Sequence, residues 1–395
     1  MSLASEAKAS SQSIDVVTAA KNLVPLILAG REEGERIRHV PPEIANALAE
    51  AGLLQMFLPR SMGGSELPPP TVFQAIETLS RADGSIGWCA MLATIVSMFT
   101  GWLSEDVGRH FSGHPADFRA AGSLRPLGCA YPADDGYRVQ GQWNFASGID
   151  HAKWLYCTCL VMDGKKPQLT TQGTPKVRAM WLPVEQATVV DTWATIGMRG
   201  TGSQDFVVNG AFVPSAHTCF LGDQPLAAGP LYNPRTFFAI ACIPVVANAL
   251  GIARGAIDTF VEMAGESTTS SATVLRDRPF AQARLAEAEA ILNAARAYVI
   301  DAVGKFWDAV EGGRSDITYD LAQVRLAIVH AMHEAVRSVD LVFHAAGTNA
   351  IYSRNPLERY FRDIHVAVQH NSAFPAQYES AGKVLMGLRP VDIGW

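Results

Sequence analysis

Apolar residues recur at helical spacing in the first part of the chain. Pro41-Pro42 divides its beginning into a long helix and a shorter one. A further helix is predicted from Val72 to Ala82, with Thr71 as its N-cap. Ser85 to Trp102 is apolar on every side, which is typical of a helix buried in a core. The pattern therefore predicts an N-terminal helical domain over residues 1–115.

Between residues 116 and 225 the pattern changes to short β-forming runs separated by Gly, Pro and Asp. Strands are predicted at Val177–Pro183, Thr188–Thr195 and Gln204–Pro214. Asp135-Gly136 lies between β-forming residues and predicts a hairpin. We therefore expect a central antiparallel β-domain.

Helical spacing returns at Phe237 and extends to about Ala309. Two more helices are predicted at Leu321–Ala345 and Arg362–His370, which complete a C-terminal helical bundle over residues 226–395. The order is helices, sheet, helices, and the fold class is α+β, mainly α. Because strands and helices do not alternate, a parallel nucleotide-binding sheet is not expected.

Composition and charge narrow the functional class. The chain has 395 residues, of which 48% are hydrophobic, enough for a large core. Its net charge is -6 and it has no Lys/Arg block, which argues against nucleic acid or an anionic membrane as a partner. The longest apolar run, Phe237–Ile252, is interrupted by Pro244 and Asn248, so no membrane span is expected. With six scattered cysteines and no signal-peptide pattern, we expect a cytoplasmic protein with reduced thiols.

Two stretches contain residues that could contact a cofactor. In Trp143–Ala152, the hydroxyl of Ser147 precedes a glycine and lies beside aromatic residues, which would suit a flat aromatic cofactor. The alternative is a β-turn with two buried aromatic side chains. The Gly-rich loop Gly197–Ser203 is neither a phosphate loop nor a dinucleotide fingerprint, because no Gly-Lys-Ser/Thr follows and the next element is a strand. It is either a plain turn or a loop whose Thr201 and Ser203 contact a cofactor.

The histidines do not form a recognisable metal or hydrolase pattern. His330 and His333 lie three residues apart on a predicted helix, but no third ligand is evident. A Gly-x-Ser-x-Gly motif is absent from the sequence. We therefore predict no metal site and no Ser-His-Asp triad.

Three segments carry a resemblance that covers most of the chain. Gly141–Gly148 resembles the flavin-facing strand of the acyl-CoA dehydrogenase fold family, with Phe145 in place of that family's Trp and Ser147 in place of its Thr. Trp193–Ser203 resembles the family's second β segment, and Phe343–Asp363 resembles its Gly-rich loop before the last helix. The resemblance implies the family's three-part fold and a flavin cofactor.

The catalytic carboxylate of many acyl-CoA dehydrogenases has no counterpart at the expected position. In those enzymes a Glu lies nine residues after the Arg that matches Arg362, and here Asn371 stands there. An amide cannot remove the α-proton of an acyl thioester. Because some members carry the Glu on an earlier helix, Glu262 or Glu266 could still serve. An FAD-dependent, acyl-CoA dehydrogenase-like enzyme that oxidises an acyl thioester is therefore the alternative.

The chain is more similar to the oxygenase components of two-component flavin-dependent monooxygenases, which share this fold. Their marks are a Ser-Gly pair in the flavin-facing strand, here Ser147-Gly148, and Arg-Asp-x-His, here Arg362–His365. A second histidine follows at His370, and Asp83–Trp88 resembles an N-terminal motif of that branch. A non-catalytic scaffold that has lost flavin is a third reading, which the hydroxyl residues at flavin-facing positions disfavour.

This resemblance implies a reaction and its participants. A separate NAD(P)H-dependent flavin reductase supplies reduced FMN or FAD (FMNH2 or FADH2), and O2 adds to give a flavin C4a-hydroperoxide. That species hydroxylates a small aromatic or heterocyclic substrate. A homotetramer with flavin near a subunit boundary is also implied.

The resemblance also implies site residues. Ser147 would hydrogen-bond near flavin N5, and His370 would handle the proton. The implied cofactor contacts are Trp143, Phe145, Ser147, Thr201, Ser203, Gly347 and Thr348. The implied substrate pocket contains Trp88, Val96 and His365, where Val96 replaces a histidine that phenol-hydroxylating relatives often carry.

Overall fold

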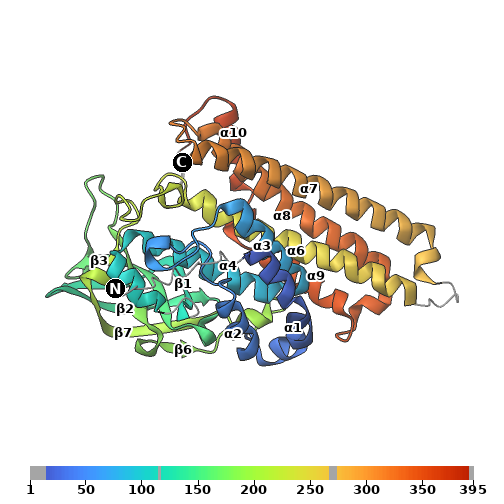
Figure 1. Cartoon of the computed structure of the whole chain (residues 1–395), viewed down its shortest axis with the longest axis horizontal. Helices are drawn as coiled ribbons and strands as arrows, with labels where there is room; N and C mark the ends of the chain where they lie inside the picture. Colours follow the sequence, from blue (N-terminus) through green and yellow to red (C-terminus); the bar gives the residue numbers. More distant parts are fainter. Residues whose placement is uncertain (1–14, 114–116, 267–273, 391–395) are drawn as a thin grey trace, which may run out of the picture.

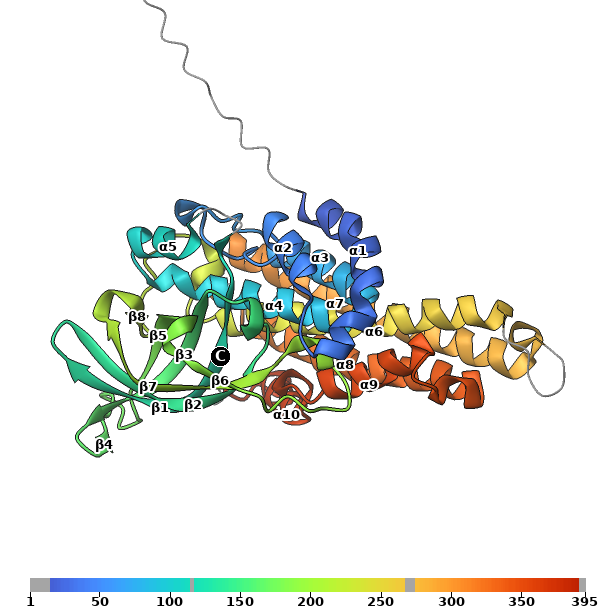
Figure 2. The same ribbon diagram turned by 90° about the horizontal axis from the view of Figure 1, so that it is seen from below.

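The computed structural model describes residues 15–113, 117–266 and 274–390, and its sheet lies between two sets of helices in the sequence. In Figures 1 and 2 the sheet packs against one end of an elongated helical body. The helices before the sheet are α1 Val16–Ile37, α2 Pro42–Glu50, α3 Pro69–Ala82, α4 Gly84–Met98 and α5 Glu105–Ser112. Those after it are α6 Phe237–Glu266, α7 Pro279–Glu311, α8 Thr318–Ala346, α9 Pro356–Ala367 and α10 Ala376–Leu385.

The sheet has the strand order β6-β7-β2-β1-β3-β5-β8, with β4 paired to β3. The strands are β1 Ala120–Ala133, β2 Gly136–Ala146, β3 Trp154–Asp163, β4 Lys166–Pro167, β5 Val177–Pro183, β6 Thr188–Val190, β7 Gln204–Pro214 and β8 Thr218–Cys219. The predicted hairpin joins β1 to β2. The strands pair antiparallel as expected, except that β1 and β3 pair in parallel.

Helices from both ends of the chain share one hydrophobic core. The middle of α6 packs on α3, where a Cβ at Gly251 or Gly255 would lie within 2.6 Å of backbone carbonyls of that helix. By length and apolarity, residues 84–102 and 237–265 resemble membrane spans, but 89% and 72% of the scored window of each is buried inside the fold. These two stretches are therefore core helices, which explains why α4 is apolar on every side.

Several predicted boundaries differ from the structure for physical reasons. Thr71 is not an N-cap, because α3 begins earlier at two prolines, whose missing N–H groups need no cap. The strand predicted at Thr188–Thr195 ends at Val190. The helix predicted to reach His370 ends at Ala367. The pattern also missed the short helices α5 and α10.

Candidate active site

The end of β2 turns sharply at the predicted cofactor-facing residues. Phe145 has a left-handed backbone with φ 64°, and Gly148 follows with φ 79°. A Cβ at Gly148 would lie 2.9 Å from the ring of His151, so only glycine fits there without displacing a neighbour. The turn directs Ser147 into the protein, where it is 4% exposed.

Three hydroxyl groups form a buried chain at this turn. The Ser147 Oγ lies 2.6 Å from the Ser203 Oγ, which lies 2.6 Å from the Thr201 Oγ1. Thr201 in turn donates to the carbonyl oxygen of Met198 at 2.8 Å. At the other end, the indole Nε1 of Trp88 donates to the Ser147 Oγ at 3.2 Å. The predicted residues Ser147, Thr201, Ser203 and Trp88 are thus brought together; we call the three hydroxyls the hydroxyl chain.

The loop that carries Thr201 is held in place by α9. The side chain of Asp363 accepts a hydrogen bond from the Met198 N–H, and Arg362 donates to the carbonyl oxygen of Ile196. A Cβ at Gly197 would lie 2.4 Å from the carbonyl oxygen of Arg362, so the loop and α9 touch backbone to backbone. The Arg-Asp pair recognised in the sequence therefore positions the loop of the hydroxyl chain.

Asp363 is a buried acid at the edge of a charged cluster. Burial, followed by the nearby carboxylate of Asp83, raises the pKa of Asp363 to about 7. Arg362 pairs with Glu35 at 3.0 Å, and Arg359 lies 4.0 Å from Asp83. This cluster links α1 and α9 with the N-cap of α4.

His370 lies after α9, at the start of a short 3₁₀ helix, Asn371–Ala373. Its Nδ1 accepts the N–H of Ser372 at 3.2 Å, and the Ser372 hydroxyl lies 3.0 Å away. Nδ1 is therefore an acceptor, which leaves the ring proton on Nε2. Burial lowers the pKa of His370 to about 4, so the ring is neutral at physiological pH. The ring meets Trp88 edge to face, with centroids 5.8 Å apart.

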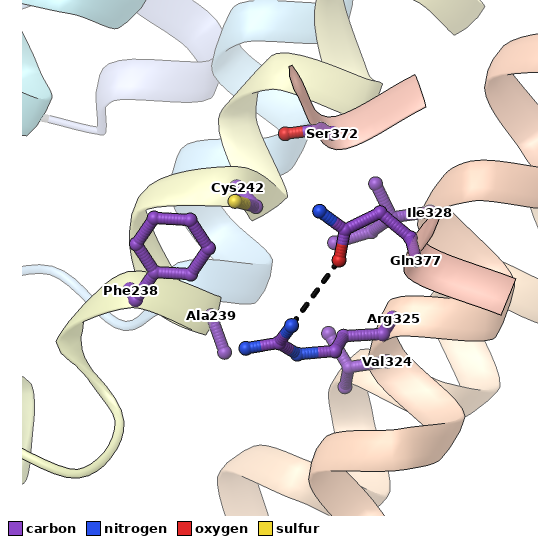
Figure 3. A pocket seen from close by; sticks show the side chains of 8 residues that line it. All are labelled: Phe238, Ala239, Cys242, Val324, Arg325, Ile328, Ser372 and Gln377. Atoms are coloured by element: carbon purple, nitrogen blue, oxygen red, sulfur yellow. Dashed lines mark hydrogen bonds between the residues drawn. The ribbon is translucent and has the colours of Figure 1, made fainter. Parts of the chain in front are cut away.

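Ser372, which hydrogen-bonds His370, also lines a small pocket (Figure 3). Arg325, only 7% exposed, donates to Gln377 at 3.2 Å, and its guanidinium lies 5.7 Å from the ring of Phe238. The pocket lies between α6, α8 and α10 and is lined by Phe238, Ala239, Cys242, Val324, Arg325, Ile328, Ser372 and Gln377.

The surface beside the hydroxyl chain suits a flat aromatic cofactor. The side chain of Phe145 is 53% exposed and that of Ile196 is 70% exposed, although both are large and apolar. Phe145 meets Trp193 edge to face, with centroids 6.2 Å apart. Apolar surface next to buried hydroxyls matches a flavin ring system, which has apolar faces and a polar edge.

Trp143, also predicted to contact the cofactor, belongs instead to the core of the sheet. It is fully buried, stacks on Phe206 with centroids 5.1 Å apart and donates to the carbonyl oxygen of Thr158. Strand alternation explains the error, because side chains two apart normally share a face, whereas the left-handed backbone at Phe145 breaks the alternation.

The predicted substrate residues lie at different distances from the hydroxyl chain. Val96 is buried on α4, eight residues and roughly 12 Å along the helix from Trp88. His365 hydrogen-bonds Asp340 on α8 at 3.0 Å, so it is tied to the helical bundle. That His365 lines the substrate pocket stays a prediction.

Gly347 and Thr348, the remaining predicted cofactor contacts, are exposed just beyond the end of α8. Arg325, which lies near Ser372, is on the same helix 22 residues earlier, or roughly 33 Å away along the axis. Neither residue makes a hydrogen bond to the hydroxyl chain, so their contact with a cofactor stays a prediction.

One structural feature near the site was not anticipated. Between Ser123 and Gly128 the pairing of β1 with β3 shifts register twice, and Arg125 reaches across to Asn144 at 3.1 Å. Pro126 within this run was the available signal, because proline inside a sheet marks a bulge or an edge. In the described ranges, no group of three or more His, Cys, Asp or Glu side chains could hold a metal ion.

Two family models match the chain. Residues 17–110 match "Acyl-CoA dehydrogenase, N-terminal domain" and residues 243–374 match "Acyl-CoA dehydrogenase, C-terminal domain". Indole-3-acetate monooxygenase of Acinetobacter baumannii is 30% identical over 356 residues, which is 89% of each chain. The flavin-dependent monooxygenase oxygenase subunit HsaA of Mycobacterium tuberculosis is 28% identical and covers 95% of this chain and 96% of its own. The crystal structure of 3-HSA hydroxylase from Rhodococcus sp. RHA1 superposes with a TM-score of 0.87 at 27% identity, covering 96% of this chain and 99% of that one.

Proposed function

This chain belongs to the acyl-CoA dehydrogenase family, in its branch of flavin-dependent monooxygenase oxygenase components, and we propose that it hydroxylates a small aromatic or heterocyclic molecule. Its cofactor is reduced flavin and its co-substrate is O2. The observation that carries the proposal is the buried hydroxyl chain, which Trp88 joins to the neutral ring of His370.

Each residue of the site has a separate role in the proposed reaction. Reduced flavin, once bound, supplies two electrons, so that one atom of O2 enters the substrate and the other leaves as water. Ser147 offers a polar contact at the flavin edge, and Phe145 offers apolar surface to the ring. Half-buried Trp88 and His370 line the side next to Ser147, where the indole N–H of Trp88 contacts the Ser147 hydroxyl and the ring of His370 meets Trp88 edge to face.

His370 acts in its neutral form. Because its pKa is lowered to about 4, it carries almost no positive charge at pH 7. Its Nε2–H is available as a hydrogen-bond donor to an oxygen atom of the substrate or of the activated oxygen, while Nδ1 is held by Ser372.

The acyl-CoA dehydrogenase alternative finds no support in the position of its base. Glu262 is exposed on α6, 20 residues and roughly 30 Å along the axis from Cys242, which lines the pocket next to Ser372. The side chain of Glu266, the other candidate, lies outside the described residues. Asn371, at the position of the usual carboxylate, is exposed.

The oxygenase depends on a separate reductase for reduced flavin, as the names of its relatives as oxygenase components indicate. We place both proteins in the cytoplasm, where NAD(P)H is available. We also propose a homotetramer with flavin near a subunit boundary, as the resemblance to the family implies, in which the exposed Gly347 and Thr348 would contact the flavin of another copy. Light scattering tests the tetramer, and a monomer would contradict it.

Substrate hydroxylation is tested with the purified protein, a flavin reductase, NADH and either FMN or FAD under ¹⁸O2. Indole-3-acetate, free indole and simple phenols are suitable first substrates, since a relative is named for the first of them. A product heavier by one ¹⁸O atom supports the proposal. Oxidation of an acyl-CoA thioester without oxygen incorporation would support the alternative instead.

A further inference from the structure

The hydroxyl chain ends at a group that can only accept hydrogen bonds. The Thr201 Oγ1 lies 2.8 Å from the carbonyl oxygen of Met198, and a carbonyl has no proton to give. The same carbonyl accepts the indole N–H of Trp193 at 3.0 Å. The backbone N–H of Thr201 also donates to it, at 3.2 Å. Two oxygen atoms 2.8 Å apart need a proton between them, and only the Thr201 hydroxyl has one, so that proton is committed to the Met198 carbonyl.

The donation from Thr201 to Met198 sets the direction of every other hydrogen bond in the hydroxyl chain. Because Thr201 has no proton left, the 2.6 Å contact with Ser203 requires Ser203 to donate. Ser203 then has none left, and the 2.6 Å contact with Ser147 requires Ser147 to donate in its turn. The hydrogen bonds therefore run from Ser147 through Ser203 and Thr201 to the Met198 carbonyl.

The contact at the Ser147 end of the hydroxyl chain is consistent with this direction. The indole N–H of Trp88 can only donate, and it occupies one of the two acceptor positions of the Ser147 oxygen. Ser147 is thus left with one lone pair and no free proton. Reversing the direction would break the hydrogen bond from the Thr201 hydroxyl to the Met198 carbonyl, between residues that are at most 2% exposed, where water does not replace it.

We propose that this fixed direction makes Ser147 a hydrogen-bond acceptor toward the flavin, so that the site selects reduced over oxidised flavin. Reduced flavin carries a hydrogen on N5 and can donate it, whereas oxidised flavin presents a lone pair there. A Ser147 oxygen without a free proton attracts the first and repels the second. The inference rests on the proposed function, which places the flavin edge at Ser147, and it assigns Thr201 and Ser203 as positioning residues.

The test is the ratio of the two dissociation constants, oxidised over reduced, measured anaerobically with FMN and with FAD. Thr201→Val removes the terminal hydroxyl, so Ser203 can donate to Ser147 and the proton of Ser147 becomes free for oxidised N5. We expect the ratio to fall at least about tenfold, the worth of one hydrogen bond in a buried site. Ser203→Ala frees the same proton directly and should lower the ratio similarly.

Two matched variants distinguish an effect of hydrogen-bond direction from an effect of altered side-chain packing. Thr201→Ser keeps the hydroxyl and should keep the wild-type ratio. Trp88→Phe removes the donor at the other end but leaves the proton of Ser147 committed to Ser203, so the ratio should change less than in Thr201→Val. Circular dichroism confirms that each variant is folded.

A wild-type protein that binds flavin without preferring the reduced form would overturn the inference. So would Thr201→Val and Ser203→Ala variants that bind flavin with the wild-type ratio. Failure of the wild type to bind flavin in either redox state would instead overturn the proposed function, and the inference with it.

Discussion

The neutral state of His370 has a measurable consequence for stability. Burial lowers its pKa from 6.5 to about 4 in the folded protein, whereas the unfolded chain keeps the ordinary value. Well above pH 6.5 the ring is neutral in both the folded and the unfolded state and does not change the free energy of unfolding. As the pH falls from 6.5 toward 4, only the unfolded chain takes up the proton, so folding stability is lost in that window.

The size of the loss follows from the two pKa values. At pH 5.0 the unfolded histidine is almost fully protonated and the folded one is mostly neutral, which lowers the free energy of unfolding by about 2 kcal/mol relative to pH 7.5. His151, whose pKa burial also lowers to about 4, adds a similar loss. The result hardly depends on the folded pKa, provided that it stays below about 5.

The assay is urea unfolding followed by circular dichroism at pH 7.5 and pH 5.0. His370→Asn keeps a side chain able to cap the following 3₁₀ helix but cannot titrate. We expect this variant to lose about 2 kcal/mol less than the wild type on acidification, and the double variant with His151→Asn to lose about 4 kcal/mol less. A wild type and a His370→Asn variant with equal losses would refute the buried neutral histidine.

Substitutions at three further positions test the geometry of the site. Ser147→Ala should raise the fraction of reduced flavin that ends as hydrogen peroxide rather than product; unchanged coupling, measured by a peroxide assay, would remove Ser147 from the mechanism. Gly148→Ala should lower the free energy of unfolding by roughly 1–3 kcal/mol, because φ is 79° and the Cβ would meet His151; a wild-type urea midpoint would contradict this. Asp363→Ala should weaken flavin binding by leaving the Met198 N–H without an acceptor, whereas Asp363→Asn keeps an acceptor oxygen and should bind several-fold better; equal affinities, measured by flavin titration, would count against the role of Asp363.

Local sequence signals were sufficient for much of the fold. The bounds of β5 and β7 match the predicted strands because each is a run of β-forming residues that ends at proline. The parallel pairing of β1 with β3 was missed, because it joins segments that are not neighbours in the sequence. No local pattern reports such long-range pairing.

In the site, too, local sequence signals identified residues but not their long-range contacts. Ser147, Thr201 and Ser203 could be selected as candidates from the sequence, but their direct contact arises from the pairing of β2 with β7, in which Ala146 faces Gln204. The direction of their hydrogen bonds depends on the Met198 carbonyl, which no side-chain motif records. Trp143 was misassigned because its strand position alone does not reveal the left-handed residue that follows it.

Stopped-flow mixing tests the central claim most directly. The anaerobic protein with reduced FMN, and separately with reduced FAD, is mixed with oxygenated buffer while the absorbance is followed. A transient band at shorter wavelength than oxidised flavin, before oxidised flavin appears, is the result expected of a monooxygenase, and it identifies the preferred flavin. Direct appearance of oxidised flavin with no transient, with both flavins, would contradict the claim and make acyl-CoA thioesters the next compounds to test.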